Sequence, residues 1–322
     1  MHWHLYIKFP LSIFRNTQFL LAIFYIFCSP IACASLLEEN QNIRTILFTM
    51  RDNEKPMIEA VIAGKKGVLM FDIGTPDLVF LNRDALNLPI GRDIVRGHAS
   101  SGQSINVQDH PTPLIKIDNL QVNLPAHIRS GDFRFTESGL GVDFLGFIGA
   151  KMIEKDAFLL DYATKRLLIM KLDSKGELLT NTPQSSDIKT IANFTISING
   201  LPTIAASIGD LPIITDFDTG DSSTLYASQY LLKILSEQGN LKPENEFWRL
   251  SGLKISGKSF NSTLVKIVET KSEQDFRTGG YPDQLRLGSK FLSANPSIWN
   301  YSNKSVLFIL PQAKLLTLPL TR

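Results

Sequence analysis

The chain carries one sequence pattern twice, and this duplication constrains its fold more than any other feature. Residues 48–86 align without a gap to residues 194–232, at a constant offset of 146 positions. Both blocks open on Phe-Thr and carry Phe-Asp-x-Gly near the centre. A second match, at an offset of 139, aligns residues 161–170 with 300–309. Because the blocks keep the same order, we expect two related lobes of ordinary domain length.

The texture within each half is that of β-structure. Short apolar runs alternate with turns that contain Gly, Asn, Asp and Lys, for example at residues 57–64, 68–71, 114–117 and 167–170. Such spacing is typical of strands. Only short helices are expected, over residues 83–88, 150–155 and 227–237. We therefore predict an all-β chain made of two homologous β-barrel lobes.

The N-terminal segment differs from the rest of the chain. Lys8 and Arg15 are the only charged residues before Glu38, and residues 19–28 are continuously apolar. Ala32-Cys33-Ala34 follows. A basic start, an apolar core and a small-x-small end describe a secretory signal peptide that is cleaved after Ala34. We expect an exported protein, periplasmic or secreted.

Two alternatives would keep the chain at a membrane. The apolar run could be an uncleaved anchor, although it is short for a span and Pro30 interrupts its end. Cys33 could instead be lipidated, since the small residue Ala32 precedes it, although the usual leucine is absent. The predicted organisation is a signal peptide (1–34), an N-terminal lobe (35–172), a polar linker (173–187) and a C-terminal lobe (188–322).

Composition argues against several classes of function. Removal of the signal peptide takes away both cysteines, Cys28 and Cys33, and two of the 33 basic residues, which leaves 31 basic against 31 acidic residues. A balanced chain without a basic run lacks the electrostatic pattern of nucleic-acid-binding proteins. The chain also lacks His-Glu-x-x-His, Gly-x-Ser-x-Gly and, once processed, any cysteine nucleophile. We expect no nucleic-acid partner.

Each repeat places an aspartate directly after an apolar strand and before a glycine. Asp72 lies in Phe-Asp-Ile-Gly-Thr and Asp218 in Phe-Asp-Thr-Gly-Asp. The strand carries the carboxylate to the end of a buried sheet, and the glycine allows a sharp turn and a close approach. One such triplet alone indicates an ordinary turn. Its presence at the equivalent place in both halves indicates a paired site.

With these motifs, the sequence over residues 43–311 resembles the aspartic peptidases, in particular bacterial retropepsin-like members fused into a single pepsin-like chain. Two further motifs support the resemblance: the apolar-apolar-Gly strand, seen as Phe147-Ile148-Gly149 and less perfectly as Arg286-Leu287-Gly288, and the closing Asp161-Tyr162…Arg166-Leu167. The resemblance implies that Asp72 and Asp218 are the catalytic pair. It also implies that the catalytic loops are supported by Gly74, Thr75, Thr219 and Gly220.

The resemblance further implies an endopeptidase that needs no metal and no cofactor. Two facing carboxylates share one proton, so one acts as general base on a water while the other donates to the peptide carbonyl. The substrate is then a polypeptide, and a monomer suffices because one chain supplies both aspartates. A substrate-covering flap is expected at residues 96–103, with Gly97, His98, Ser100, Ser101 and Gly102. The alternative is a plain surface loop.

Three residues depart from the family pattern. Ile73 stands where Thr is usual, so the hydroxyl brace between the two catalytic loops should come from Thr219 alone. Asp221 stands where a small residue supports the catalytic carboxylate, and a third carboxylate there demands a cation or a proton. Asp216 should face the same side as Asp218, where the first lobe has Met70.

These departures leave two alternatives to the enzyme open. Asp216, Asp218 and Asp221 could bind a hard cation such as calcium or magnesium, because such ions prefer oxygen ligands. The chain could also be a catalytically inactive relative that binds extended peptides in the cleft between its lobes, because a shared fold does not guarantee a shared activity.

Overall fold

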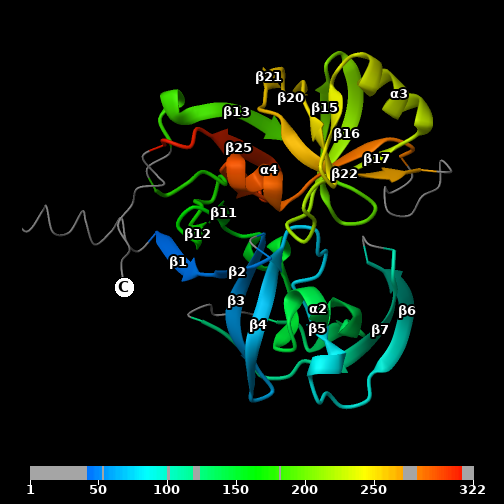
Figure 1. Ribbon diagram of the computed structural model, residues 1–322. Coiled ribbons are helices and arrows are strands. Elements are labelled where there is room, and N and C mark those ends of the chain that lie inside the picture. The colour runs from blue at the N-terminus through cyan, green and yellow to red at the C-terminus, as the bar shows by residue number, and fades with distance from the viewer. Residues whose placement is uncertain are drawn as a thin grey trace, which may run out of the picture. The chain divides into compact units, whose positions relative to one another are not determined.

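A computed structural model describes residues 42–52, 54–99, 102–118, 124–180, 183–270 and 281–313. The predicted signal peptide with Cys33, and the flap residues Ser100 and Ser101, lie outside the described residues. Within the described part the strands form three sheets (Figure 1). The helices of the same part include none that is long and apolar enough to cross a membrane.

The first half of the chain forms a nine-stranded sheet. In spatial order its main path runs β2 (Thr49–Arg51), β3 (Lys55–Ile62), β4 (Lys65–Asp72), β10 (Phe144–Gly149), β5 (Val79–Asn82), β9 (His127–Gly131), β7 (Ser104–Pro111) and β6 (Arg92–His98), and β8 (Ile115–Ile117) pairs with β3. We call this sheet and its connections lobe one.

The second repeat forms a ten-stranded sheet, which we call lobe two with its connections. Its main path runs β18 (Leu241–Glu244), β19 (Phe247–Leu250), β22 (Thr263–Glu269), β17 (Thr224–Ala227), β23 (Gln284–Leu287), β16 (Leu211–Phe217), β15 (Pro202–Ile208), β20 (Leu253–Ile255) and β21 (Lys258–Ser259), and β14 (Thr195–Ile196) pairs with β15. The prediction of an all-β, two-lobed fold is confirmed.

The same parallel strand pair lies at the centre of both lobes. In lobe one β4 pairs with β10, and in lobe two β16 pairs with β23. In lobe one the inner ends of these strands are buried and almost wholly apolar, as is usual for strands covered on both faces. In lobe two the buried ends also carry Asp216 and Arg286. A side chain at Gly149 would place its Cβ 2.0 Å from the carbonyl oxygen of Asp77, and one at Gly288 would lie 2.1 Å from that of Asp221. The glycine of the repeated motif therefore lets the strand pass against the aspartate loop.

A third, six-stranded sheet joins the two repeats. Its order is β1 (Ile43–Leu47), β12 (Arg166–Met170), β11 (Ala157–Asp161), β24 (Ser297–Asn300), β25 (Ser305–Ile309) and β13 (Ile188–Asn193). The first three strands come from the first repeat, and antiparallel pairing of β11 with β24 sets Phe158 opposite Trp299. The duplicated blocks at 161–170 and 300–309 thus meet in one sheet, a pairing that the sequence analysis did not anticipate.

The helical segments are few and short. They are η1 (Arg83–Ala85), η2 (Arg134–Thr136), α2 (Glu137–Leu140), η3 (Ala150–Ile153), η4 (Ser185–Asp187), α3 (Gln229–Glu237) and α4 (Ser289–Ala294). The helix predicted at 227–237 is confirmed as α3, where the Ser228 side chain accepts from the backbone N–H of Leu231. The predictions at 83–88 and 150–155 were too long, because the chain leaves the helical conformation at Leu86 and after Glu154. The sequence analysis missed α4.

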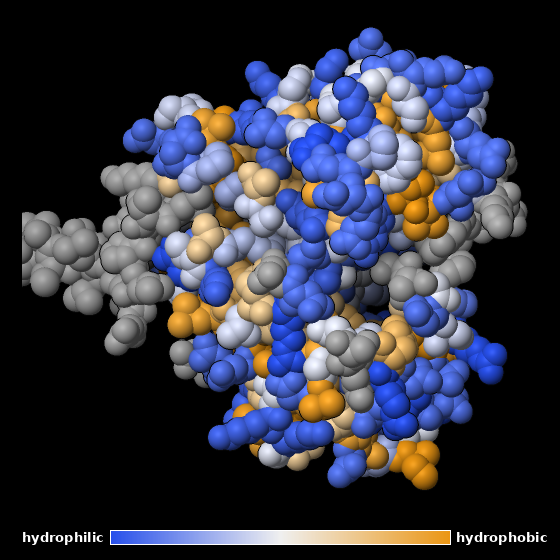
Figure 2. All heavy atoms as spheres, viewed as in Figure 1, coloured by the Kyte–Doolittle hydropathy of each residue, from blue (hydrophilic) through white to orange (hydrophobic). Residues whose placement is uncertain are grey.

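Residues from Asn42 onward belong to one compact unit. The predicted linker lies between β12 and β13, and the domain boundaries stay predictions. In the view of Figure 2 hydrophilic side chains cover most of the surface, and hydrophobic residues form small, separate patches. That face therefore presents no broad apolar area.

Candidate active site

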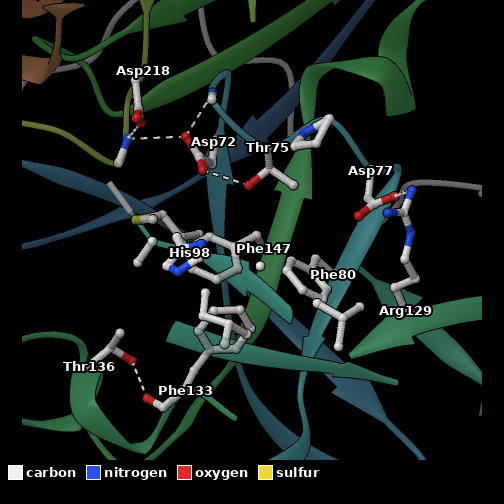
Figure 3. Close-up of a pocket in the computed structure, with 18 of the residues that line it drawn as sticks. Asp72, Thr75, Asp77, Phe80, His98, Arg129, Phe133, Thr136, Phe147 and Asp218 are labelled. Carbon is white, nitrogen blue, oxygen red and sulfur yellow. Dashed lines mark hydrogen bonds and ion pairs between the residues drawn. The ribbon is translucent and has the colours of Figure 1, made fainter. Parts of the chain in front are cut away.

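Asp72 and Asp218 come together from the ends of equivalent strands. Asp72 is the last residue of β4, and Asp218 follows β16 directly. The backbone N–H of Gly220 lies 3.1 Å from Oδ1 of Asp72 and 2.8 Å from Oδ1 of Asp218, so one donor serves both carboxylates. Figure 3 shows both side chains directed toward the same space. The prediction that the two halves bring these aspartates together agrees with this geometry.

Neutral donors surround the Asp72 carboxylate. The backbone N–H of Gly74 donates to Oδ1 at 2.9 Å, and the Thr75 hydroxyl donates to Oδ2 at 2.6 Å. A Cβ at position 74 would lie 2.5 Å from Cγ of Asp218, so only glycine fits between the two acids. Gly74, Thr75, Thr219 and Gly220, all predicted to support the catalytic loops, thus contact the pair or the strand that carries it.

Burial and mutual repulsion favour the protonated form of Asp72. Desolvation, the nearby charge of Asp218 and a hydrogen bond between the two carboxyl groups raise the pKa of Asp72 from 3.8 to about 7, against the lowering effect of Thr75 and Gly74. Asp72 is 7% exposed, and Asp218 is equally buried. Two acids this close cannot both ionise cheaply, so the pair holds one proton.

This pKa makes the stability of the fold depend on pH. The folded state holds a proton on Asp72 that the unfolded chain releases near pH 4, so stability falls as pH rises from about 4 to about 7. Asp72→Asn removes this dependence. We expect the free energy of unfolding of the variant, relative to that of the wild type, to rise by about 4 kcal/mol between pH 4 and pH 8. Urea unfolding at the two pH values measures this difference. An equal stability difference at both pH values would contradict the burial of a protonated Asp72.

A single threonine braces the two aspartate loops. The Thr219 hydroxyl accepts from the backbone N–H of Ile73 at 3.0 Å and donates to the carbonyl of Phe71 at 2.8 Å. Ile73 contributes its backbone, while its side chain is 2% exposed within the apolar core. These bonds agree with the predicted one-sided brace, in which Ile73 takes part through its backbone N–H.

Thr219→Val keeps the shape of the side chain but removes the brace. The variant leaves a buried N–H and a buried carbonyl without their partner, so we expect a loss of about 2–4 kcal/mol in the free energy of unfolding. Thr219→Ser, which keeps the hydroxyl, is the matched control and should lose less, about 1 kcal/mol. Thermal or urea unfolding of both proteins tests this. Equal stabilities would show that the hydroxyl contributes nothing.

Asp216 and Asp221 do not intrude on the pair as free carboxylates. Asp216 forms a bidentate, buried ion pair with Arg286, with Nε–Oδ1 at 3.0 Å and Nη2–Oδ2 at 2.8 Å. Asp221 accepts from the backbone N–H of Ser223 and from the Thr224 hydroxyl, within its own loop. Among the described residues, no three His, Cys, Asp or Glu side chains are arranged to hold a metal ion. The cation that pairs with Asp216 is Arg286.

Arg286 is the site residue that the sequence analysis overlooked. Its Nη1 lies 3.6 Å from Oδ2 of Asp218, and its guanidinium is 4% exposed. A comparison of the two repeats would have pointed to Arg286. Lobe one pairs Met70 with Phe147 in β4 and β10, whereas lobe two pairs Asp216 with Arg286 at the equivalent register. A simultaneous change of both partners from apolar to oppositely charged residues marks an ion pair.

A second charged contact links the lobes beside the pair. Lys290 on α4 lies 2.6 Å from Oε1 of Glu54, which precedes β3, and the Ser222 hydroxyl donates to Oε2 of the same carboxylate. Burial opposes ionisation of Glu54, but the hydrogen bonds from Lys290 and Ser222 outweigh it and lower its pKa. The Asp218 loop is thereby tied to lobe one.

A cavity of about 600 Å³ opens over Asp72 and Asp218. Apolar side chains of lobe one form much of its wall: Met70, Phe80, Ile105, Val107, Phe133 and Phe147. Figure 3 shows the labelled phenylalanines on the side of the cavity away from the acids. The Phe133 ring centre lies 5.0 Å from that of Phe147 and 5.1 Å from that of Phe80, so the wall is a packed aromatic cluster.

The segment predicted as a flap is a β-hairpin at the rim of this cavity. β6 pairs with β7 in an antiparallel register that sets Gly97 opposite Ile105 and His98 opposite Ser104. Gly97, His98 and Ala99 line the cavity together with both aspartates. Gly102 lies in the turn, where its backbone N–H donates to the carbonyl of Ala99. A hairpin rather than a plain loop occupies the predicted place.

Comparison with known proteins identifies the fold. No protein-family model and no curated protein matches the sequence. Among solved structures, the aspartic proteinase from Irpex lacteus is similar over 84% of this chain and 98% of that chain, with a TM-score of 0.53 and 13% identity. The fold is that of an aspartic proteinase. At this identity the likeness concerns the fold alone, so the chemistry of the pepsin-like fold must be argued from the residues of this chain.

Proposed function

We propose that the protein is an aspartic endopeptidase that hydrolyses peptide bonds with Asp72 and Asp218. The observation that carries the proposal is the shared donor at Gly220: its N–H contacts Oδ1 of both acids, so the two carboxyl groups face one space at the floor of the cavity. The pepsin-like fold and the apolar, hairpin-covered cavity support it.

The proposed reaction uses the two acids as a unit. One carboxylate takes a proton from a water held between them, and the other, protonated, donates to the carbonyl oxygen of the peptide. A tetrahedral intermediate forms without a covalent bond to the enzyme, and proton return to the nitrogen releases the amine. The raised pKa of Asp72 keeps one proton on the pair at mildly acidic pH.

The features that favoured an inactive relative are accommodated in this site. The Ile73 backbone takes part in the brace although its side chain cannot. The Asp221 carboxylate is occupied by Ser223 and Thr224 of its own loop. The two departures therefore leave the contacts of both acids with Gly220 in place.

We further propose that a bulky apolar side chain next to the cleaved bond enters the cavity of lobe one. Its wall presents Phe80, Phe133 and Phe147 on the side opposite the acids (Figure 3). An extended polypeptide is the fitting substrate, and the β6–β7 hairpin is placed to cover it. Export to the periplasm or beyond, as the N-terminal segment predicts, would give access to unfolded proteins there.

The test is digestion of an unfolded protein by the purified protein from pH 3 to pH 8, with and without a statine-type inhibitor. We expect cleavage beside bulky apolar residues, identified by mass spectrometry of the fragments, and its suppression by the inhibitor. Absence of cleavage by a well-folded protein at every pH would overturn the proposal and leave peptide binding as the function to pursue.

A further inference from the structure

The two acids of the proposed dyad differ in what touches their outer oxygens. Oδ2 of Asp72 receives the hydroxyl of Thr75 at 2.6 Å. The residue equivalent to Thr75 in lobe two is Asp221, which has no hydroxyl and is held within its own loop. Oδ2 of Asp218 faces the guanidinium of Arg286 at 3.6 Å instead. A neutral contact in lobe one is thus replaced by a cationic contact in lobe two.

These two contacts respond differently to a proton. A hydroxyl is both donor and acceptor and can rotate, so Thr75 can bond to Asp72 in either protonation state. A guanidinium only donates and keeps its charge, so Arg286 favours Asp218 as the carboxylate. The Gly220 N–H contacts both acids and does not distinguish them. Gly74 also donates a backbone N–H to Oδ1 of Asp72, so it is the charge of Arg286, and not the number of donors, that sets the two acids apart.

Arg286 is held in the orientation that this role requires. Its Nε and Nη2 are fixed by Asp216, and Nη1 is left toward Asp218 and the Tyr226 hydroxyl, which lies 3.4 Å away. Asp216 cancels part of the positive charge, but it binds the far side of the guanidinium. The side chains of Arg286 and Asp218 are 4% and 10% exposed, so solvent screens the contact between them only weakly.

Other titratable groups also face the dyad. Asp216, Asp221, Tyr226, Tyr162 and Tyr301 interact electrostatically with one or both acids. His98 of β6 lines the same cavity, and Glu54, Lys55 and Lys290 form a neighbouring charged group. Burial raises the pKa of Tyr162, Tyr226 and Tyr301, which therefore stay neutral. Lys290 is engaged by Glu54 at 2.6 Å. Arg286 is the cation whose nitrogen reaches Oδ2 of Asp218.

We infer that Arg286 is a positioning residue that decides where the shared proton resides: it holds Asp218 as the carboxylate and leaves the proton on Asp72. This inference rests on the proposed function, in which Asp218 then becomes the general base toward water and Asp72 the general acid toward the peptide carbonyl. Asp216 and Asp221 are tolerated beside the dyad because they belong to this charge arrangement.

The direct test is an NMR titration of the resting protein labelled with ¹³C at the aspartate Cγ atoms, with Asp72→Asn and Asp218→Asn used for assignment. In the wild type we expect the Asp218 signal to stay at the carboxylate position while Asp72 changes from acid to carboxylate. The comparison variant is Asp216→Met/Arg286→Phe, which installs the lobe-one pair of Met70 and Phe147. In that variant the pH at which the pair loses its first proton should rise by about one unit or more. The Cγ signals of both aspartates should change in that step.

A second double variant, Asp216→Asn/Arg286→Gln, removes the same charges with little change of shape and serves if the first fails to fold. The acid limb of the pH profile of kcat/KM should move upward with the NMR step. A merely structural role would lower stability or kcat without moving that limb. Equal titration of the two acids in the wild type, or an unchanged titration in the variants, would overturn the inference. Since NMR needs no turnover, absence of proteolysis would count against the proposed function alone.

Discussion

Asp72→Asn and Asp218→Asn are each expected to lower kcat/KM for a peptide substrate by about 10³-fold or more. Each acid performs one of the two proton transfers, and general acid or base catalysis contributes about 10²–10⁴-fold. An asparagine keeps the size of the side chain and the bond to Gly220, but it can neither take a proton from water nor deliver one to the carbonyl. Steady-state kinetics at the optimum pH measure the effect.

The stability of these variants provides the control. Asp72→Asn relieves a buried acid and should unfold no earlier than the wild type at neutral pH. A loss of activity in a protein of equal or greater stability would therefore be chemical. Asp77→Asn is a matched comparison within the same cavity, because Asp77 lines it and pairs with Arg129 rather than with a catalytic acid. It should change kcat/KM far less. Retention of more than a tenth of the wild-type activity by either catalytic variant would contradict the proposed chemistry.

Arg286→Met is expected to lower the free energy of unfolding by about 3–5 kcal/mol. Removal of one partner from a buried ion pair leaves the other as an uncompensated charge, and Asp216 is 2% exposed. Asp216 could take up a proton, but it must then do so beside Asp218 and Asp221. Urea unfolding at pH 7 measures the loss, which should shrink toward acidic pH as Asp216 becomes protonated.

The double variant Asp216→Met/Arg286→Phe is the counterpart of this experiment. It removes both charges together and replaces them by the pair found at Met70 and Phe147, which the same strand register accommodates in lobe one. Replacement of a buried ion pair by apolar residues is often neutral or stabilising. We expect it to be at least about 2 kcal/mol more stable than Arg286→Met. A double variant as unstable as the single one would show that the site requires these side chains for their shape.

Most of the fold could be predicted from the duplication in the sequence. Equivalent apolar strands, each ending at an aspartate, imposed the same parallel strand pair on both lobes, and both aspartates arrived at one place. The six-stranded sheet escaped prediction because strand pairing between distant segments depends on how the lobes associate, and neither β11 nor β24 carries a partner-specific pattern. Helix ends were overestimated where an extended residue such as Leu86 terminates a single turn.

The site was predictable as far as the repeats agree with one another. The equivalent positions of Asp72 and Asp218 followed from the repeats, and the one-sided brace of Thr219 followed from the resemblance to the aspartic peptidases. The role of Arg286 did not follow, because it stands in a motif position where lobe one has the apolar Phe147. Its ion pair with Asp216 was not predicted, because the two residues lie 70 positions apart in the chain and meet through the pairing of β16 with β23.

The most direct test of the central claim, that two aspartates act as one catalytic unit, is a double-mutant cycle on kcat/KM. It compares the wild type, Asp72→Asn, Asp218→Asn and the double variant on one peptide. Residues that act as a unit give losses that do not add. If the two aspartates act as one unit, each single variant should be as inactive as the double variant, within a few-fold. Losses that multiply, or a single variant that retains substantial activity, would contradict it.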